Sequence, residues 1–330
     1  MNIVFLLYSN RSGSTFLSSK LSTFECVNVS VETTFVSLLI ENGKTDFNGS
    51  DLENIEKLLL KDKKLSEWSV DLKGLIVNLS KKITFSIRDI VEEVLYLEFG
   101  TKNGVFVVKD PRISFHANKA FKLMDQVKFI HVVRDPRAVI SSQLKSKSSF
   151  NGKSMSSGAY YSAKNWQKQY RIIKDIPDEF VLRVKYENMI ENIDIELLRV
   201  KDYLGLNVSV GEKVISEDYV NKIPKSQKHL HILVGKDANK SRMNAWKSEM
   251  SDTNIYIIQY VLIKELNEIG YEVENDIPRN SLLIIFSLVK EFVMKLYMSI
   301  SDLSKNASRR EYYKYLIKQK LQRIFKLLRL

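Results

Sequence analysis

The stretch that most constrains this chain is residues 2–21, in which an apolar run leads straight into a short polar turn. Residues 3–8 read Ile-Val-Phe-Leu-Leu-Tyr, a continuous run of the kind that forms a strand buried on both faces of a parallel sheet. After the polar residues 9–15, Phe16, Leu17 and Leu21 recur at helical spacing. A strand, a tight turn and a helix N-terminus direct several backbone N–H groups at one point, which favours a phosphate site.

The residues of the turn also suit an anion. Gly13 lets the backbone approach a ligand closely, and Arg11 adds a planar, permanent positive charge. Further donors are the hydroxyls of Ser12, Ser14 and Thr15. The turn is not a Walker A loop, because Ser14 follows Gly13 where that motif has Lys. A polar turn after a strand is more often purely structural, so a second signal has to decide.

A second stretch of this kind is residues 133–144, which read VRDPRAVISSQL and follow another apolar run. Asp135 and Pro136 suit the N-cap and the first turn of a helix. Arg134 then lies at the end of a strand and Ser142 about two turns into the helix, so both side chains can hold one phosphate. The plain alternative is a helix start with exposed serines.

Short apolar runs alternate with helical patterns along the chain, and residues 34–99 are expected to be mainly helical. This alternation predicts an α/β fold, P-loop-like, with three α/β/α layers around a mainly parallel central sheet. Ligands of such sheets bind beyond the C-termini of the strands. A shift in composition predicts a domain of residues 1–275 and a helical, basic amphipathic extension of residues 276–330. The strands expected after the first are residues 27–31, 105–108, 128–133 and 180–184.

Composition excludes several classes of protein. The single cysteine, Cys26, excludes an intramolecular disulfide and a cysteine-rich metal site. His229 and His231 have no third ligand nearby in the sequence, so no metal is expected. The chain has no convincing signal peptide and no uncharged apolar run of about 18 residues. We therefore expect a cytoplasmic protein without a transmembrane helix.

The net charge of +12 is concentrated near the end of the chain. Residues 301–330 contain nine Lys and Arg against two acidic residues, and an apolar helical stripe runs from Tyr313 to Leu328. Nucleic-acid proteins usually spread such charge over the binding domain, so no nucleic acid is expected. A basic amphipathic helix at 305–330 favours an anionic membrane surface, such as the inner face of the cytoplasmic membrane. The alternative is a terminal helix packed on the domain or on a partner.

Together, residues 9–15 and 134–142 resemble the sulfotransferases that use 3′-phosphoadenosine 5′-phosphosulfate (PAPS). The first stretch looks like the 5′-phosphosulfate loop of that family, with Arg11 as the basic residue before Ser-Gly-Ser-Thr. The second resembles the 3′-phosphate motif, and its Arg-Asp-Pro-Arg-Ala-Val wording is typical of carbohydrate and bacterial members. The resemblance implies PAPS as co-substrate and a hydroxyl acceptor, in particular that of a carbohydrate or glycan.

Weaker similarities continue the resemblance over roughly residues 1–274, in the order of the family. Residues 184–189 look like the Arg-Tyr-Glu-Asp-Leu segment of the family, and this implies that Tyr186 contacts the adenine. Residues 240–247 look like the late cofactor loop, which implies that Arg242 and Trp246 bind the cofactor.

The chemistry that the resemblance implies can be matched to residues. Sulfuryl transfer builds negative charge on the bridging oxygen, and cationic donors stabilise it. Arg11 suits this role, as does Lys109 at the end of a neighbouring strand. The acceptor hydroxyl needs a base. Cytosolic members use a His where this chain has Pro111, whereas carbohydrate-type members place a Glu after the second strand. Glu32 has that position and is the expected base, with Asp110 as the alternative.

Two other functions stay open at this point. A P-loop-type nucleotide kinase would share the fold class, and the strand that ends in Asp110 superficially resembles a Walker B motif. The missing Gly-Lys-Ser/Thr argues against it. The other alternative to a sulfotransferase is a non-catalytic, membrane-associated scaffold that keeps a nucleotide-binding fold.

Overall fold

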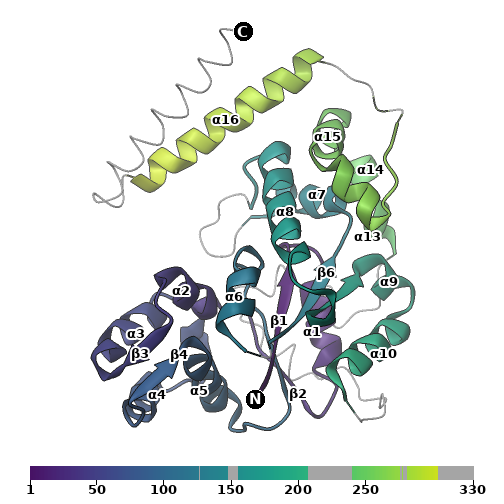
Figure 1. Cartoon of the computed structure of the whole chain (residues 1–330). Coiled ribbons are helices and arrows are strands. Elements are labelled where there is room, and N and C mark those ends of the chain that lie inside the picture. The colour runs from purple at the N-terminus through teal and green to yellow at the C-terminus, as the bar shows by residue number, and fades with distance from the viewer. Residues whose placement is uncertain (126, 148–154, 207–239, 276, 278–280, 304–330) are drawn as a thin grey trace.

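Five parallel strands form the central sheet, in the order β2-β5-β1-β6-β7. Figure 1 shows β1, β2 and β6 of this sheet among the helices. The computed structural model describes residues 1–125, 127–147, 155–206, 240–275, 277 and 281–303, with side chains described to residue 295 of the last helix. The strands are β1 Asn2–Tyr8, β2 Val27–Val29, β3 Asp46–Asn48, β4 Thr84–Ser86, β5 Val105–Val108, β6 Lys128–Val133 and β7 Val181–Lys185. The α-helices are α1 Ser14–Leu21, α2 Phe35–Asn42, α3 Leu52–Leu59, α4 Leu72–Ser80, α5 Ile87–Phe99, α6 Ala117–Leu123, α7 Pro136–Lys145, α8 Ala159–Lys174, α9 Tyr186–Glu191, α10 Ile193–Leu204, α13 Ser241–Asn244, α14 Trp246–Glu249, α15 Asp252–Ile269 and α16 Ser281–Leu303.

Strand β1 contributes to two hydrophobic cores because successive side chains of a strand point to opposite faces. Phe5 belongs to a core with residues of α2, α3, α4 and α5, while Leu6 belongs to a core with residues of α1, α9 and α10. A third core, which contains Trp246, joins α7, α8, α14 and α15. Helices therefore cover both faces of a parallel sheet, and the predicted three-layer α/β fold is confirmed.

The predicted strands agree closely with the structure. The runs 105–108 and 128–133 are strands with the predicted bounds, while the second strand ends at Val29 and the last begins at Val181. Residues 34–99 are mainly helical as predicted, but they also contain a two-stranded antiparallel sheet of β3 and β4 that was not predicted. Each of these strands has three residues, too few for a recognisable alternation.

The parallel register brings the candidate residues to one edge of the sheet. Phe5 of β1 lies opposite Val108 of β5 on one side and Phe129 of β6 on the other. The three strands therefore end near the same edge, and Ser9, Lys109 and Arg134 are the first residues after their ends. Ligands of such sheets bind at this edge, which is why the site has to be built there.

The C-terminal part begins with α16, which packs against α8 and α15. None of the helices that the structure describes is long and apolar enough to span a membrane. The basic segment 305–330 lies outside the described residues, as do His229 and His231. The division into a domain of residues 1–275 and an extension of residues 276–330 stays a prediction.

Candidate active site

The turn between β1 and α1 is closed by a hydrogen bond from the N–H of Ser12 to the carbonyl of Ser9, at 3.1 Å. Arg11 has φ 76° and Gly13 has φ 96°, both in the left-handed region. A Cβ on Gly13 would lie 2.3 Å from Cδ2 of Tyr186, so glycine is required by space as well as by conformation. Gly13 is the N-cap of α1 and offers no side-chain cap, so the first N–H groups of the helix are left for an anion.

Arg134 joins three segments at the end of β6. Its Nη1 donates to the carbonyl of Arg11 at 3.0 Å and its Nη2 to the carbonyl of Arg242 at 2.7 Å. The guanidinium lies over the ring of Tyr186, 4.2 Å from the ring centroid. The side chain is buried, and its Nε has no hydrogen-bond partner among the described residues. A buried donor without a partner is costly, which suits a site that receives an anionic oxygen.

The two motifs that the sequence placed 131 residues apart meet directly. Arg11 Nε donates to Oγ of Ser142, on α7, at 3.1 Å. The next residue of α7, Gln143, donates from Nε2 to the carbonyl of Asn10 at 2.8 Å and so fixes the turn. The hydroxyl of Ser12 is buried and has no partner in the described part of the chain. The two motifs therefore contribute side chains to one place at the edge of the sheet.

Three guanidiniums, those of Arg11, Arg134 and Arg242, lie close enough to affect one another. Burial lowers the pKa of Arg11, and the guanidiniums of Arg134 and Arg242 lower it further. Burial also lowers the pKa of Arg134, although Tyr186 and Glu187 partly oppose this effect. Like charges repel unless an anion lies between them, so the cluster suits a phosphate or a sulfate.

Lys109 contacts the start of α1. Its Nζ donates to Oγ1 of Thr15 at 2.7 Å, and its backbone N–H donates to Oγ of Ser30 at 3.0 Å. The side chain is buried, and burial lowers the pKa of Lys109 to about 8. The charge of Glu32 opposes that shift and the charge of Lys64 adds to it, so both residues act on Lys109 electrostatically.

Glu32 lies at the same edge and pairs with Lys64, which comes from the turn after α3. Asp62 holds this turn against the Glu32 segment, because it accepts hydrogen bonds from Thr33 Oγ1 at 2.6 Å and from the N–H of Thr34 at 2.7 Å. Nothing in the sequence indicated a role for Lys64 or Asp62 at this site. In the sequence they belong to a run of charged residues, which is typical of a solvated surface.

Asp110, the alternative base, is fully buried and already engaged. Its two carboxylate oxygens accept from the N–H groups of Ser37 and Arg112, each at 2.9 Å. Burial raises the pKa of Asp110 to about 6. One oxygen anchors the start of α2 and the other holds the turn after β5. The Glu32 side chain is 18 % exposed, so Glu32 is the more accessible carboxylate.

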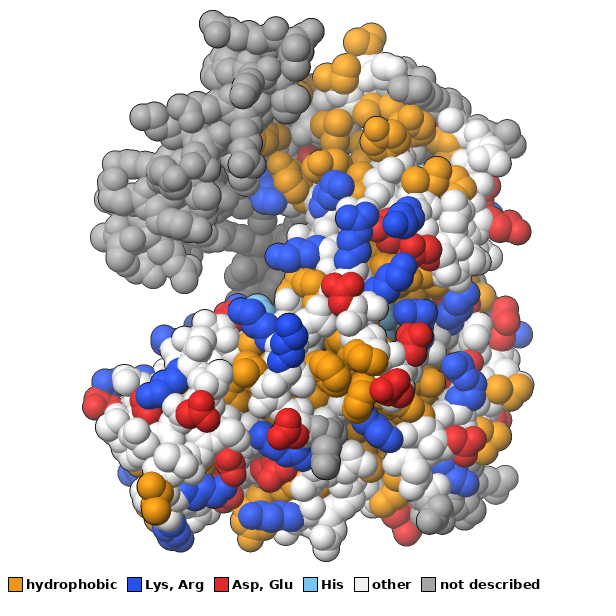
Figure 2. All heavy atoms as spheres, viewed as in Figure 1, with side chains coloured by type: hydrophobic (Ala, Val, Ile, Leu, Met, Phe, Trp, Pro, Cys, Tyr) orange, Lys and Arg blue, Asp and Glu red, His pale blue; other side chains and the backbone are white. Residues whose placement is uncertain are grey.

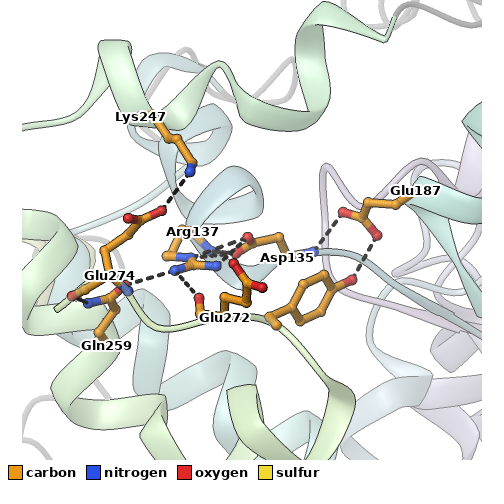
Figure 3. A network of polar contacts seen from close by, with 8 residues as sticks. Asp135, Arg137, Glu187, Lys247, Gln259, Glu272 and Glu274 are labelled. Atoms are coloured by element: carbon orange, nitrogen blue, oxygen red, sulfur yellow. Dashed lines mark hydrogen bonds and ion pairs between the residues drawn. The ribbon is translucent and has the colours of Figure 1, made fainter.

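A second layer of polar contacts holds the β6–α7 turn in place (Figure 3). Asp135 caps α7 as predicted, accepting from the N–H of Arg137 at 2.8 Å, and it pairs with the guanidinium of Arg137. Glu187 accepts from the N–H of Asp135 at 3.1 Å. Trp246 is buried, and the Arg137 guanidinium lies 4.1 Å from its ring centroid. The structure thus places Trp246 behind the turn, and direct contact of this residue with the cofactor stays a prediction.

Another buried contact fixes the beginning of the turn. Ser9 donates from Oγ to Oε1 of Gln169, on α8. Nothing in the sequence indicated Gln169, because it lies in the middle of a long helix. The predicted residues of the turn, of β6–α7 and of Tyr186 nevertheless come together, and Arg242 joins them through its carbonyl. Among the described residues there is no group of His, Cys, Asp and Glu that could hold a metal ion.

Comparisons with known proteins agree with this geometry. Residues 4–209 match the family described as the sulfotransferase family. The fold is similar to the sulfotransferase domain from the olefin synthase of Synechococcus PCC 7002, with TM-score 0.53, 19 % identity and coverage of 83 % of this chain and 96 % of that domain. It is also similar to the sulfotransferase domain from the curacin biosynthetic pathway, with TM-score 0.52, 17 % identity and coverage of 83 % and 99 %. No curated protein sequence matched.

Proposed function

Because the chain belongs to the sulfotransferase family, we propose that it transfers a sulfuryl group from PAPS to a hydroxyl of an acceptor. The observation that carries this proposal is the 3.1 Å hydrogen bond between Arg11 and Ser142, which joins the two phosphate motifs. A nucleotide with phosphates at two ends needs two anion sites at a fixed separation. Donors that come from separate motifs and share one edge of the sheet are suited to this requirement.

The residues divide between the two ends of PAPS. The turn residues Ser12–Thr15, with the N-terminus of α1, would hold the 5′-phosphosulfate. Arg134 and Ser142 would hold the 3′-phosphate, and the free Nε of Arg134 is a donor of the right kind. Tyr186 is held in place by the guanidinium of Arg134 and borders Gly13, a position from which its ring can border the adenine. Arg242 and Trp246 would help to bind the 3′-phosphate end of PAPS.

Three residues would act directly in the transfer of the sulfuryl group. Glu32 takes the proton of the acceptor hydroxyl as the new S–O bond forms to the acceptor oxygen. The bond between sulfur and the bridging oxygen breaks, and 3′,5′-ADP leaves with the electron pair of that bond. Lys109 and Arg11 stabilise the negative charge that develops on the bridging oxygen, as preorganised cations do in phosphoryl transfer. No metal ion is needed for this step.

We propose a carbohydrate or glycan hydroxyl as the acceptor. The support is the Arg-Asp-Pro-Arg-Ala-Val wording of residues 134–139, which is typical of the carbohydrate and bacterial branch. A nucleotide kinase is the weaker candidate. Its expected Walker B carboxylate, Asp110, is buried and engaged by two backbone N–H groups, so it is not available to a magnesium ion.

The test is transfer of label from PAPS to a panel of sugars, oligosaccharides and other hydroxyl compounds, followed by identification of the sulfated product. In the variant Glu32→Gln, 3′,5′-ADP binding should persist while turnover is lost. Glu53→Gln is the control, because Glu53 is an exposed carboxylate on α3 that also pairs with a lysine. Full turnover in Glu32→Gln would remove Glu32 from the role of base.

The basic segment of residues 305–330 bears on where in the cell the enzyme works. We propose that the enzyme works in the cytoplasm and that residues 305–330 contact the anionic inner face of the cytoplasmic membrane. Nine basic residues between 305 and 329 support this proposal by their charge.

A further inference from the structure

Helix α16 has apolar side chains on two opposite sides. Ile284 and Leu288 pack against the core that joins α7, α8, α14 and α15. On the other side of the helix, Phe286 and Val289 are exposed to solvent. A helix that covers a domain normally presents polar residues to water on its outer side. The outer side of α16 therefore requires an explanation other than the folding of the domain.

The orientation of α16 is fixed by a buried carboxylate. Glu291 is 6 % exposed and accepts hydrogen bonds from the N–H groups of Tyr160 and Tyr161, at 3.1 and 3.3 Å. Helix α8 has no side-chain cap of its own at Gly158, so Glu291 serves as its cap from another helix. A Cβ on Gly158 would lie 2.0 Å from Cδ of Glu291, which shows how closely the two helices approach. The inner face of α16 is thereby specified, and the outer face cannot rotate inward.

The outer face forms a continuous apolar stripe. Its members recur at i, i+4, i+7 and i+11, which places them along one side of the helix. They are Leu282, Phe286, Val289 and Val293, which are 79 %, 68 %, 55 % and 56 % exposed. Figure 2 shows hydrophobic side chains gathered at the top of the view, over α15 and the start of α16. Such a contiguous exposed stripe marks an interaction surface, unlike single exposed apolar residues.

Charge decides which occupant fits this stripe. Residues 281–330 contain eleven Lys and Arg and three Asp and Glu, a net charge of +8 out of +12 for the whole chain. A second copy of the chain on this face would bring two such segments together, and like charges would oppose the contact. An anionic lipid surface would instead attract the segment and accept the apolar side chains below its headgroups.

We infer that the outer face of α16 lies in the headgroup region of an anionic bilayer, with the stripe Leu282, Phe286, Val289 and Val293 inserted among the acyl chains. The inference deepens the membrane contact proposed above and rests on it. It adds a hydrophobic anchor to an electrostatic attraction, and two signals of this kind are what stable peripheral binding requires. Because Glu291 fixes α16 on α8, the anchor also fixes which side of the enzyme faces the membrane.

The test is flotation of the full chain with vesicles, measured for the wild type and for Phe286→Ser/Val289→Ser. The vesicles contain phosphatidylcholine alone or with one third phosphatidylglycerol. We expect binding to the anionic vesicles only, and a loss of at least about tenfold in partitioning for the double variant. The matched control is Val77→Ser/Ile83→Ser, which removes exposed apolar side chains far from α16 in the chain and should bind as the wild type does. Binding of 3′,5′-ADP should be equal in all three proteins, which verifies folding.

The possible contrary results distinguish a wrong anchor on α16, a wrong membrane contact and a second copy of the chain as the true partner. If the wild type binds the anionic vesicles and the double variant binds equally well, the α16 anchor is wrong while the basic contact stands. If the wild type does not bind at all, both proposals fail, and sulfuryl transfer from PAPS is unaffected by that failure. If the wild type is a dimer in solution that Phe286→Ser/Val289→Ser converts to a monomer, a second copy covers the stripe and the inference is overturned.

Discussion

Replacing Lys109 with Met should make the protein more stable and less active at the same time. Lys109 is buried, and burial lowers its pKa from 10.5 to about 8. At neutral pH the folded protein therefore holds a buried ammonium at an energetic cost. Met has a similar length and no charge, so Lys109→Met removes this cost. It also removes the cation from the site of sulfuryl transfer.

The size of the effect follows from the pKa difference. The shift from 10.5 to about 8 corresponds to about 3 kcal/mol of folding free energy at pH 7. Loss of the hydrogen bond to Thr15 Oγ1 offsets about 1 kcal/mol. The variant should therefore be about 2 kcal/mol more stable, in the absence of nucleotide. Turnover should fall by about 100-fold or more, because a preorganised donor to the developing charge is lost.

The difference in unfolding free energy between Lys109→Met and the wild type should depend on pH. Between pH 8 and 10.5 the unfolded chain keeps the Lys109 proton that the folded chain has released, so this group makes the wild type more stable as pH rises. The advantage of Lys109→Met should shrink over the same range. Urea unfolding at pH 7 and pH 9.5 measures it, with the exposed Lys73→Met as a matched control that should show neither effect. A Lys109→Met protein that is less stable than the wild type at pH 7 would show that the buried ammonium does not destabilise the folded protein.

Two further predictions concern the base and the 3′-phosphate. Lys64→Met removes the cation paired with Glu32, which makes the Glu32 carboxylate easier to protonate. The acidic limb of the kcat/KM profile should then move to higher pH, and an unmoved limb would show that Lys64 does not affect protonation of the base. Arg134→Ala removes a buried guanidinium that touches Arg11, Tyr186 and Arg242. Calorimetry should show 3′,5′-ADP affinity about 100-fold lower, against no change for the surface variant Arg199→Ala, and equal affinities would exclude Arg134 from the site.

The sequence predicted the parts of the site that depend on strand ends. The runs at 105–108 and 128–133 are apolar and end in charged residues, and parallel strands that start in register end at a common edge. This geometry is enough to bring Arg11 close to Ser142. It explains why two motifs far apart in sequence were sufficient to identify the family.

The residues that the sequence did not reveal depend on packing between distant elements. Lys64 reaches Glu32 only because Asp62 fixes its turn against residues 33 and 34, and no local pattern encodes that contact. Glu291 interrupts an apolar segment and in the sequence resembles a break in it. In the structure it is the buried residue that attaches α16 to α8. Both cases are charges whose partners lie on other elements, and only the fold identifies those partners.

We propose that the edge of the sheet binds the two phosphates of PAPS rather than a nucleoside triphosphate with magnesium. Calorimetry of the wild type with 3′,5′-ADP, and separately with ATP and magnesium, tests it most directly. The site predicts a measurable, saturable affinity for 3′,5′-ADP that needs no metal, and weaker or no binding of ATP with magnesium. Tight binding of ATP with magnesium, together with no binding of 3′,5′-ADP, would show that the edge of the sheet is not a PAPS site.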